Sequence, residues 1–446
     1  MPVKKASSST APAVKSKTTS IAVAENNSED FQIFWQEFWR YTPDIDREQR
    51  SKSEWQAIAA KLWQSLKKFK GSSIVHSENI LQAGSKENYS ATAFYVVTPD
   101  MTYIISSIIN ALKQRGWESH VIIHPTIFGK PSKGQFSNLA SPENAENLVA
   151  VETVYIETDY ISDPLEVKKI EQKILDVLGD LEKVTLDQEK LWEVLHETRH
   201  ELAAHKALAD RKEQAEVVAF IDWLSPKNLT LLGYRKYSYH RNGNHIDVKI
   251  IPNKGLGMLR DDELVLAEEK SLARDSMRSA DTSFLNKKRV MTFSKSSYQA
   301  TVQRNTYYDR FGFRIFDDEG NVIGGNLFIG LFSPHVFEVD LNEIPIVRDR
   351  IKFVYEKLDF PTQCSNYRMI GEILRSYPRS ELFLTSREQL AQNVKRVLDL
   401  QGRSEPILAV RHDLYERYVS CLIFVPREIY SNVLAQIGRA SCRERV

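Results

Sequence analysis

The spacing of hydrophobic residues changes several times along the chain, and each change predicts a different kind of structure. Residues 1–29 are rich in Ser, Thr, Ala and Lys and contain no aromatic residue. Such a segment buries too little apolar surface to offset the entropy of ordering, so we expect a disordered tail. Residues 30–88 place apolar side chains at three- and four-residue steps, which predicts a helical preface with two amphipathic helices.

Residues 89–185 show the clearest pattern. A β-branched and aromatic run, ATAFYVVT, precedes Pro99; the helical pattern MTYIISSIINALKQR ends at Gly116, and WESHVIIHP is a second strand. Because the connection is a helical crossover, we expect the two strands to be parallel, either as neighbours or separated by one strand. The strand LVAVETVYIETD and the helix PLEVKKIEQKILDVLGDL complete the order β-α-β-β-α, which predicts a ferredoxin-like layer.

The remaining segments predict an α+β chain with further domains. A long charged helix at about 187–224 ends before Pro226 and forms a connecting segment, 186–225. Residues 226–340 have strand patterns and turn residues, which predict a mostly antiparallel β-rich domain with ATVQR (300–304) as one strand. Residues 341–403 have helical spacing, and 404–436 contain two strands that start a second domain.

Composition excludes several classes of protein. Sixty Lys and Arg against fifty-nine Asp and Glu give a formal charge of +1, so no overall field attracts nucleic acid or an anionic membrane. No apolar stretch approaches the roughly 18–20 residues that span a bilayer. The three cysteines form no C-x-x-C pair. We therefore expect a soluble, cytoplasmic protein with neither a nucleic-acid nor a membrane partner.

One short motif resembles a zinc site. His196, Glu197 and His200 match H-E-x-x-H, which on a helix presents two imidazoles and a general base on one face. The helical spacing, however, assigns the buried stripe to other residues and turns the two histidines toward water. That stripe comprises Leu191, Leu195, Thr198 and Leu202. We expect no metal site, and a zinc-dependent hydrolase that uses these three residues stays as an alternative.

Nucleotide and nucleophile motifs do not occur in the chain. The segment GLGMLR (255–260) contains G-x-G but runs into Asp261 and Asp262, so it predicts a turn and not a phosphate cradle. Neither a P-loop nor a G-x-S-x-G pattern is present. We therefore expect no catalytic residue and no cofactor-binding residue in this chain.

The loop between the first strand and its crossover helix is the candidate site for a small effector. It comprises Pro99, Asp100, Met101 and Thr102. Backbone amides at the start of the helix are suited to a carboxylate, and Asp100 is suited to accept from an amino group. The alternative is that Asp100 caps the helix, and the two roles are compatible.

Several collinear stretches resemble the N-terminal region of the large bacterial NAD-specific glutamate dehydrogenases, over about residues 31–436. The matching stretches are YVVTPDMTYIISSIINALKQRG with VIIHP (95–125), AFIDWLSPKNLTLLGYRKY (219–237), GLGMLR (255–260), SKSSYQATVQRNTYYDRFGFRIFDDEGNVIGGNLFIGLFS (294–333), EIPIVRDRI, ILRSYPRSELF and RYVSCLIFVPREIYS. Where the family usually reads His-Arg after S-T-V, this chain has Gln303 and Arg304.

The resemblance implies an oxidoreductase that converts L-glutamate, NAD and water to 2-oxoglutarate, ammonium and NADH. It implies ACT-like domains at 89–185 and, in part, at 404–436, of a kind that senses amino acids or mediates assembly. It also implies that the catalytic and NAD-binding region lies beyond residue 446.

The end of the resemblance completes the sequence-based hypothesis. Residues 437–446, IGRASCRERV, break the likeness and are expected to be a non-native tail on an incomplete protein. We expect this chain alone to be an inactive regulatory or assembly fragment, whose partners are the missing catalytic domain, an amino-acid effector and further copies in a homo-oligomer. A pure oligomerisation module is the other alternative.

Overall fold

The computed structural model describes most of the chain, in two compact units. The described residues are 28–82, 89–132, 135–208, 210–242, 245–261, 289–400, 403, 405–413, 418–426 and 429–431. Unit 1 comprises Met1–Glu182 together with Thr301–Asn305, and unit 2 comprises Lys183–Ala300 and Thr306–Val446. The expected disordered tail, except its last two residues, and the expected non-native tail lie outside the described residues.

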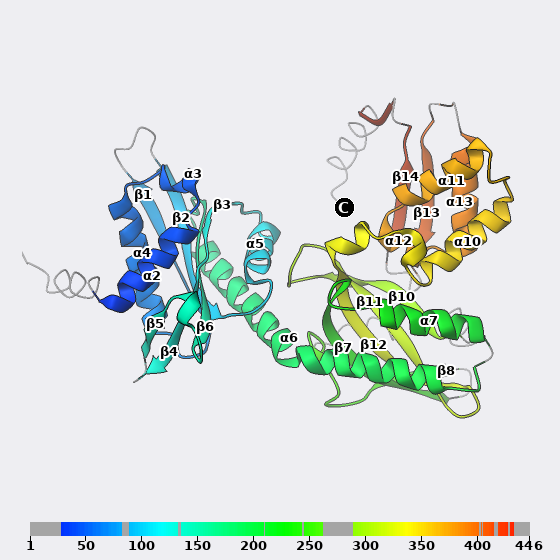
Figure 1. The fold of residues 1–446 in the computed structure, drawn as a ribbon, viewed down its shortest axis with the longest axis horizontal. Coiled ribbons are helices and arrows are strands. Elements are labelled where there is room, and N and C mark those ends of the chain that lie inside the picture. Colours follow the sequence, from blue (N-terminus) through cyan, green and yellow to red (C-terminus); the bar gives the residue numbers. More distant parts are fainter. Residues whose placement is uncertain are drawn as a thin grey trace, which may run out of the picture. The chain divides into compact units, whose positions relative to one another are not determined.

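Unit 1 is built on a six-stranded antiparallel sheet (Figure 1). Its strands are β1 (Ile74–Gln82), β2 (Tyr89–Pro99), β3 (Ser119–Ile123), β4 (Thr126–Ser132), β5 (Gln135–Ala140) and β6 (Val149–Asp159). Strand β6 lies between β2 and β3 and is antiparallel to both. Strands β2 and β3 are therefore parallel and separated by one strand, which confirms that prediction.

Strand β1 corrects the sequence analysis, which placed residues 74–82 in the helical preface. It pairs with β2 from Ile74 to Gln82 and occupies the edge position that a fourth strand takes in a ferredoxin-like sheet. Most of its residues are neither buried nor fully exposed. This uniform half-burial gives little alternation of apolar and polar residues, so the strand lacks the usual sequence signal.

Helices cover both faces of this sheet. They are α2 (Glu29–Tyr41), α3 (Asp44–Arg47), α4 (Lys52–Lys67), α5 (Ile104–Gln114) and the long α6 (Pro164–Ala204), with a short 3-10 turn at Pro142–Asn144. Helices α2 and α4 pack their aromatic residues against one face, on Tyr95 and Tyr155. Ser77 pairs with Phe94 on the other face and donates to Glu171 of α6.

Helix α6 is longer than predicted. The sequence pattern predicts a helix that ends near 181 and another at about 187–224, whereas α6 is continuous to Ala204 and a second helix, α7, follows at Arg211–Trp223. No Gly or Pro lies between Glu182 and Asp187, so nothing interrupts the first helix there. The break falls later, where the Asp210 side chain accepts from the Glu213 backbone N–H and starts α7.

Unit 2 contains the predicted antiparallel sheet. Its strands are β7 (Leu229–Asn242), β8 (His245–Ile250), β9 (Leu256–Gly257), β10 (Met291–Gln299), β11 (Tyr307–Phe316) and β12 (Val322–Phe332), in the order β10-β11-β12-β7-β8 with β9 beside β7. The expected strand ATVQR is wrong, because residues 301–304 form bends and Gln303 has a φ of 71°. Segment 301–305 belongs to unit 1.

The rest of unit 2 is helical and ends in a hairpin. Its elements are the 3-10 turns Pro334–Phe337 and Leu341–Glu343, α10 (Val347–Leu358), α11 (Ser365–Ser376), α12 (Arg379–Leu384), α13 (Arg387–Asp399), and the strands β13 (Ile407–His412) and β14 (Val419–Phe424). The strands pair antiparallel. Ile407 and Ala409 are buried, whereas the alternate residues Leu408 and Val410 are exposed.

A buried ion pair connects the helical preface to the sheet of unit 1. Arg50, which lies between α3 and α4, donates to both carboxylate oxygens of Glu157 on β6, at 2.5 and 2.9 Å. The exposed fractions of the two side chains are 3% and 0%. Tyr155 also donates its hydroxyl to Glu157, and Arg50 lies over the Trp55 ring. The Glu157 charge is therefore fully compensated inside the protein.

Breaking this pair should destabilise unit 1 strongly. Arg50→Ala is expected to cost about 3–5 kcal/mol, because it leaves a buried carboxylate without its cation. Urea unfolding followed by circular dichroism measures the loss. Lys61→Ala, which removes the exposed partner of Glu78, is the control and should cost less than about 1 kcal/mol. Equal losses in the two variants would contradict this account.

Candidate functional site

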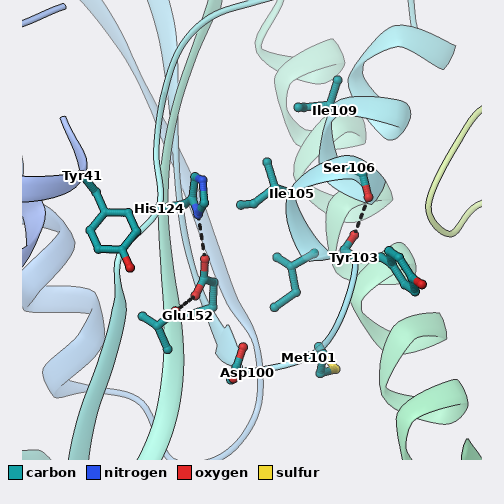
Figure 2. Close-up of a pocket in the computed structure, with 11 residues that line it drawn as sticks. Tyr41, Asp100, Met101, Tyr103, Ile105, Ser106, Ile109, His124 and Glu152 are labelled. Atoms are coloured by element: carbon teal, nitrogen blue, oxygen red, sulfur yellow. Dashed lines mark hydrogen bonds and ion pairs between the residues drawn. The ribbon is translucent and has the colours of Figure 1, made fainter. Parts of the chain in front are cut away.

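Unit 1 contains a cavity of about 540 Å³ at the start of helix α5. Helix α5 forms one side, and the ends of β3, β4 and β6 form the other (Figure 2). We refer to it as the α5 pocket. It is lined by Tyr41, Asp100, Met101, Tyr103, Ile104, Ile105, Ser106, Ile109, His124, Thr126 and Glu152.

The strand side of the pocket is acidic. Glu152 on β6 is only 6% exposed. One of its oxygens lies 3.1 Å from His124 Nδ1, and the other accepts from the Thr126 hydroxyl at 2.6 Å. No Lys or Arg is among the residues that line the pocket. Among the described residues, the lining of the pocket therefore has two carboxylates, Glu152 and Asp100, and no permanent cation.

Asp100 lies in the loop between β2 and α5, and the acidic surroundings affect the ionisation of its carboxyl. Burial raises the pKa of the Asp100 carboxyl above its usual range, and the nearby Glu152 charge raises it further. A hydrogen bond from the Met101 N–H opposes part of this rise in the pKa. A cation placed between the two carboxylates would relieve their repulsion, so this side of the pocket is suited to an ammonium group.

The helix side of the pocket presents the start of α5. The helix begins at Ile104, and its cap position is Tyr103, which has a left-handed backbone with a φ of 69° and makes no capping bond through its side chain. The first turn contains no acidic residue. The first amides of a helix have no partner within it and carry the positive end of the helix dipole. This end is suited to a carboxylate.

Apolar side chains complete the pocket. Ile105 and Ile109 project from successive turns of α5, and Tyr41 comes from the last residue of α2 (Figure 2). The Tyr41 ring meets the His124 imidazole edge to face, with 5.9 Å between ring centroids. An aliphatic group bound between the two polar sides would contact the two isoleucines.

The structure separates the sequence-predicted effector residues into two groups. Asp100 and Met101 line the pocket, whereas Pro99 ends β2 and Thr102 is exposed, and neither is among the lining residues. The alternative that Asp100 caps the helix is wrong, because the cap position is Tyr103. The turn at Tyr103 places the cap three residues beyond Asp100, and the helix begins at Ile104.

Sequence reasoning missed the residues that come from other elements. Glu152, His124 and Tyr41 are distant from the loop in sequence. The acidic residues within the strand LVAVETVYIETD, where apolar side chains alternate with Glu152 and Glu157, were an available signal for Glu152. Tyr41 gave no signal, because only the packing of α2 brings it to the pocket.

The HETRH motif lies on an exposed helix face. His196, Glu197 and His200 are exposed, and within the described residues no group of three His, Cys, Asp or Glu side chains is placed to hold a metal ion. The predicted buried stripe is confirmed. Leu191, Leu195, Thr198 and Leu202 are all at most 3% exposed. The H-E-x-x-H pattern is therefore part of an ordinary charged helix surface.

The GLGMLR segment contains the predicted turn, at Met258 and Leu259, directly after the two-residue strand β9. The Gly257 N–H donates to Asp187 at 2.8 Å, and Arg260 donates to the same carboxylate. A Cβ on Gly255 would lie 2.1 Å from the Leu259 carbonyl oxygen, so a larger residue does not fit. The glycines allow close packing within the protein.

Known families match three parts of the chain. The family model described as glutamate dehydrogenase, ACT1 domain, matches residues 34–174. The family models for helical motif 1 and for the ACT2 domain of glutamate dehydrogenase match residues 344–403 and 407–440. Within the described part of the chain, none of the helices has the length and hydropathy that crossing a membrane requires.

Curated relatives give the same result. The NAD-specific glutamate dehydrogenases of Halomonas elongata and Pseudomonas aeruginosa are 29% and 27% identical over 79% and 76% of this chain, and that of Mycobacterium tuberculosis is 23% identical over 60%. The alignments span 22%, 21% and 15% of those proteins. A solved RNA-binding Light-Oxygen-Voltage Receptor aligns at 11% identity with a TM-score of 0.14, which is too low to inform fold or function.

The zinc alternative is open to a direct test. His196→Ala and His200→Ala are expected to change neither the metal content nor the unfolding temperature, because both imidazoles point to solvent. Elemental analysis after dialysis against a chelator, with calorimetric unfolding, gives both values. Stoichiometric zinc in the wild type that is lost in either variant would restore the hydrolase hypothesis.

Proposed function

We propose that this chain, which carries the ACT1 domain, helical motif 1 and ACT2 domain of the NAD-specific glutamate dehydrogenases, regulates such an enzyme through an amino-acid site in unit 1. The family matches and the curated relatives support the assignment to these N-terminal domains. The alignments span about a fifth of the length of the curated relatives from Halomonas elongata and Pseudomonas aeruginosa. The complete protein would oxidise L-glutamate with NAD in the cytoplasm, and its regulatory part would act on a catalytic region elsewhere.

The α5 pocket carries the proposal about the effector. It presents two carboxylates on one side, a helix N-terminus on the other and isoleucines between them. These features match the ammonium, the carboxylate and an aliphatic side chain of a neutral L-amino acid. Asp100 and Glu152 would accept from the ammonium, while the amides of Ile104 and Ile105 would donate to the carboxylate.

The same features select against acidic ligands. Glutamate, aspartate and 2-oxoglutarate carry an additional carboxylate, and no Lys or Arg lines the pocket to neutralise it. A buried carboxylate without a cation is costly. The proposed effector is therefore chemically distinct from the substrate and product of the reaction, as a regulatory ligand can be.

Assembly is a second proposed role, because each edge of the unit 1 sheet is a strand with one partner. Strand β1 pairs only with β2, and β5 only with β4, among the described strands. Edge strands are templates for pairing with another chain. We propose a homo-oligomer of the complete protein, and light scattering of the purified chain tests whether these edges associate.

Binding of a neutral amino acid is the first test. Isothermal titration calorimetry of the chain with L-valine should give saturable binding. L-glutamate should bind at least about tenfold more weakly, because the described lining of the pocket offers no cation for its second carboxylate. Asp100→Asn is expected to reduce L-valine affinity by about five- to 100-fold, the loss of one charge-assisted hydrogen bond. Asp318→Asn, an exposed change in unit 2, is the matched control. Tighter binding of L-glutamate than of any neutral amino acid would refute the site.

The pH dependence of L-valine affinity provides an independent test. Ionised Asp100 binds an ammonium more strongly than the protonated acid does, because the hydrogen bond is then charge-assisted, and the pKa of Asp100 is raised in the free protein. Affinity should therefore hold above this raised pKa and fall by up to about tenfold per pH unit below it. His124 also lines the pocket, so the comparison with Asp100→Asn isolates the contribution of the aspartate. Identical pH profiles for wild type and Asp100→Asn would exclude a role for this carboxyl.

A further inference from the structure

A short loop of the β-rich region is held by unit 1. Residues Thr301–Asn305 belong to unit 1, whereas the strands before and after them in the chain, β10 and β11, belong to unit 2. We call this segment the 301–305 loop. It is part of the stretch that the sequence analysis expected to be a strand, and neither the fold of unit 2 nor the α5 pocket accounts for its position.

Two hydrogen bonds fix the 301–305 loop on two helices. The Gln303 N–H donates to the Ser107 hydroxyl of α5 at 2.8 Å. The Thr301 hydroxyl donates to Asp180 of α6 at 2.9 Å. Ser107 and Val302 are both fully buried. The loop therefore bonds to α5 through a backbone amide and to α6 through a hydroxyl, and it buries an apolar side chain.

The backbone conformation of Gln303 indicates that these contacts keep the loop in place. Gln303 has a φ of 71°, in the left-handed region that a glutamine rarely adopts. Such a conformation costs free energy and persists only where surrounding contacts impose it. The bond to Ser107 comes from the same residue. A loop released from α5 would relax to an ordinary conformation.

Helix α5 separates the 301–305 loop from the pocket. Ile105 and Ile109 line the pocket, and Ser107 lies two residues from each of them. At about 100° per residue, Ser107 therefore projects roughly 200° away around the helix. The pocket and the loop contact opposite flanks of one short rigid helix. A ligand in the pocket that shifts α5 would therefore also move the Ser107 hydroxyl that binds the loop.

We propose that docking of the 301–305 loop on α5 and α6 is coupled to ligand binding in the α5 pocket. The coupling rests on the proposed amino-acid site, whereas the docking does not. Since binding free energies are linked, a ligand that tightens the docking must itself bind more weakly when the loop is released, and by the same factor. The 301–305 loop thereby connects the helix that lines the pocket to strands β10 and β11 of unit 2, which precede and follow it in the chain.

Hydrogen exchange measured by mass spectrometry on the whole chain tests the docking. Without any ligand, the Gln303 amide should exchange about tenfold faster in Ser107→Ala than in wild type, the loss expected for one buried hydrogen bond. Asp180→Ala should also raise exchange across residues 301–305. Asp176→Ala, on the same helix but bonded only to Gln172 in the described contacts, is the matched control and should leave the loop unchanged. Exchange of the wild-type loop at the rate of an unstructured peptide would overturn the docking.

Titration of the same variants with L-valine tests the coupling. Saturating L-valine should slow exchange of residues 301–305 in wild type, and Asp180→Ala should change L-valine affinity by about five- to 150-fold, with Asp176→Ala unchanged. Equal affinity in wild type and in a variant whose loop is shown to be released would overturn the coupling. Absence of L-valine binding to wild type would refute the proposed effector and the coupling together, and the exchange data would still decide the docking.

Discussion

The compensation of two buried carboxylates on strand β6 is the constraint on which unit 1 depends. Glu152 and Glu157 are 6% and 0% exposed and lie five residues apart, so the alternation of a strand directs them to opposite faces of the sheet. Glu157 receives a permanent cation from Arg50 and a hydroxyl from Tyr155. Among the described side chains, the Glu152 carboxylate contacts His124 and accepts from the Thr126 hydroxyl, and Asp100 adds a second negative charge nearby. The buried carboxylate on one face is therefore paired with a permanent cation, whereas the described lining of the pocket on the other face contains two carboxylates and neither Lys nor Arg.

In the proposed regulation, this difference between the two faces links the fold to ligand binding. Helices α2 and α4 close the Glu157 face with aromatic packing, while α5 and α6 lie on the face that carries Glu152. The pocket forms where the start of α5 meets the ends of the strands (Figure 2). A ligand there would bridge a helix and a sheet, and such a bridge can favour one relative position of the two. The family matches place this arrangement in the ACT1 domain of glutamate dehydrogenases.

Much of the architecture could be predicted because its segments have strong periodicity. The β-α-β order, the parallel relation of β2 and β3, the antiparallel sheet of unit 2 and the buried stripe of α6 all follow from apolar spacing or turn residues. Features set by distant contacts could not be predicted. Strand β1 depends on pairing with β2, and the 301–305 loop leaves its expected strand because Ser107 and Asp180 hold it. The loop before α5 was identified from sequence, but Glu152, His124 and Tyr41 reach the pocket only through the tertiary fold.

A crystal structure of the chain grown with L-valine tests the central claim most directly, since it locates the ligand atoms against these groups. The account predicts density in the α5 pocket, with the ammonium within hydrogen-bonding distance of Asp100 and Glu152 and the carboxylate at the amides that begin α5. A well-ordered α5 pocket without ligand at saturating L-valine, or a ligand bound with its carboxylate toward Glu152, would contradict it.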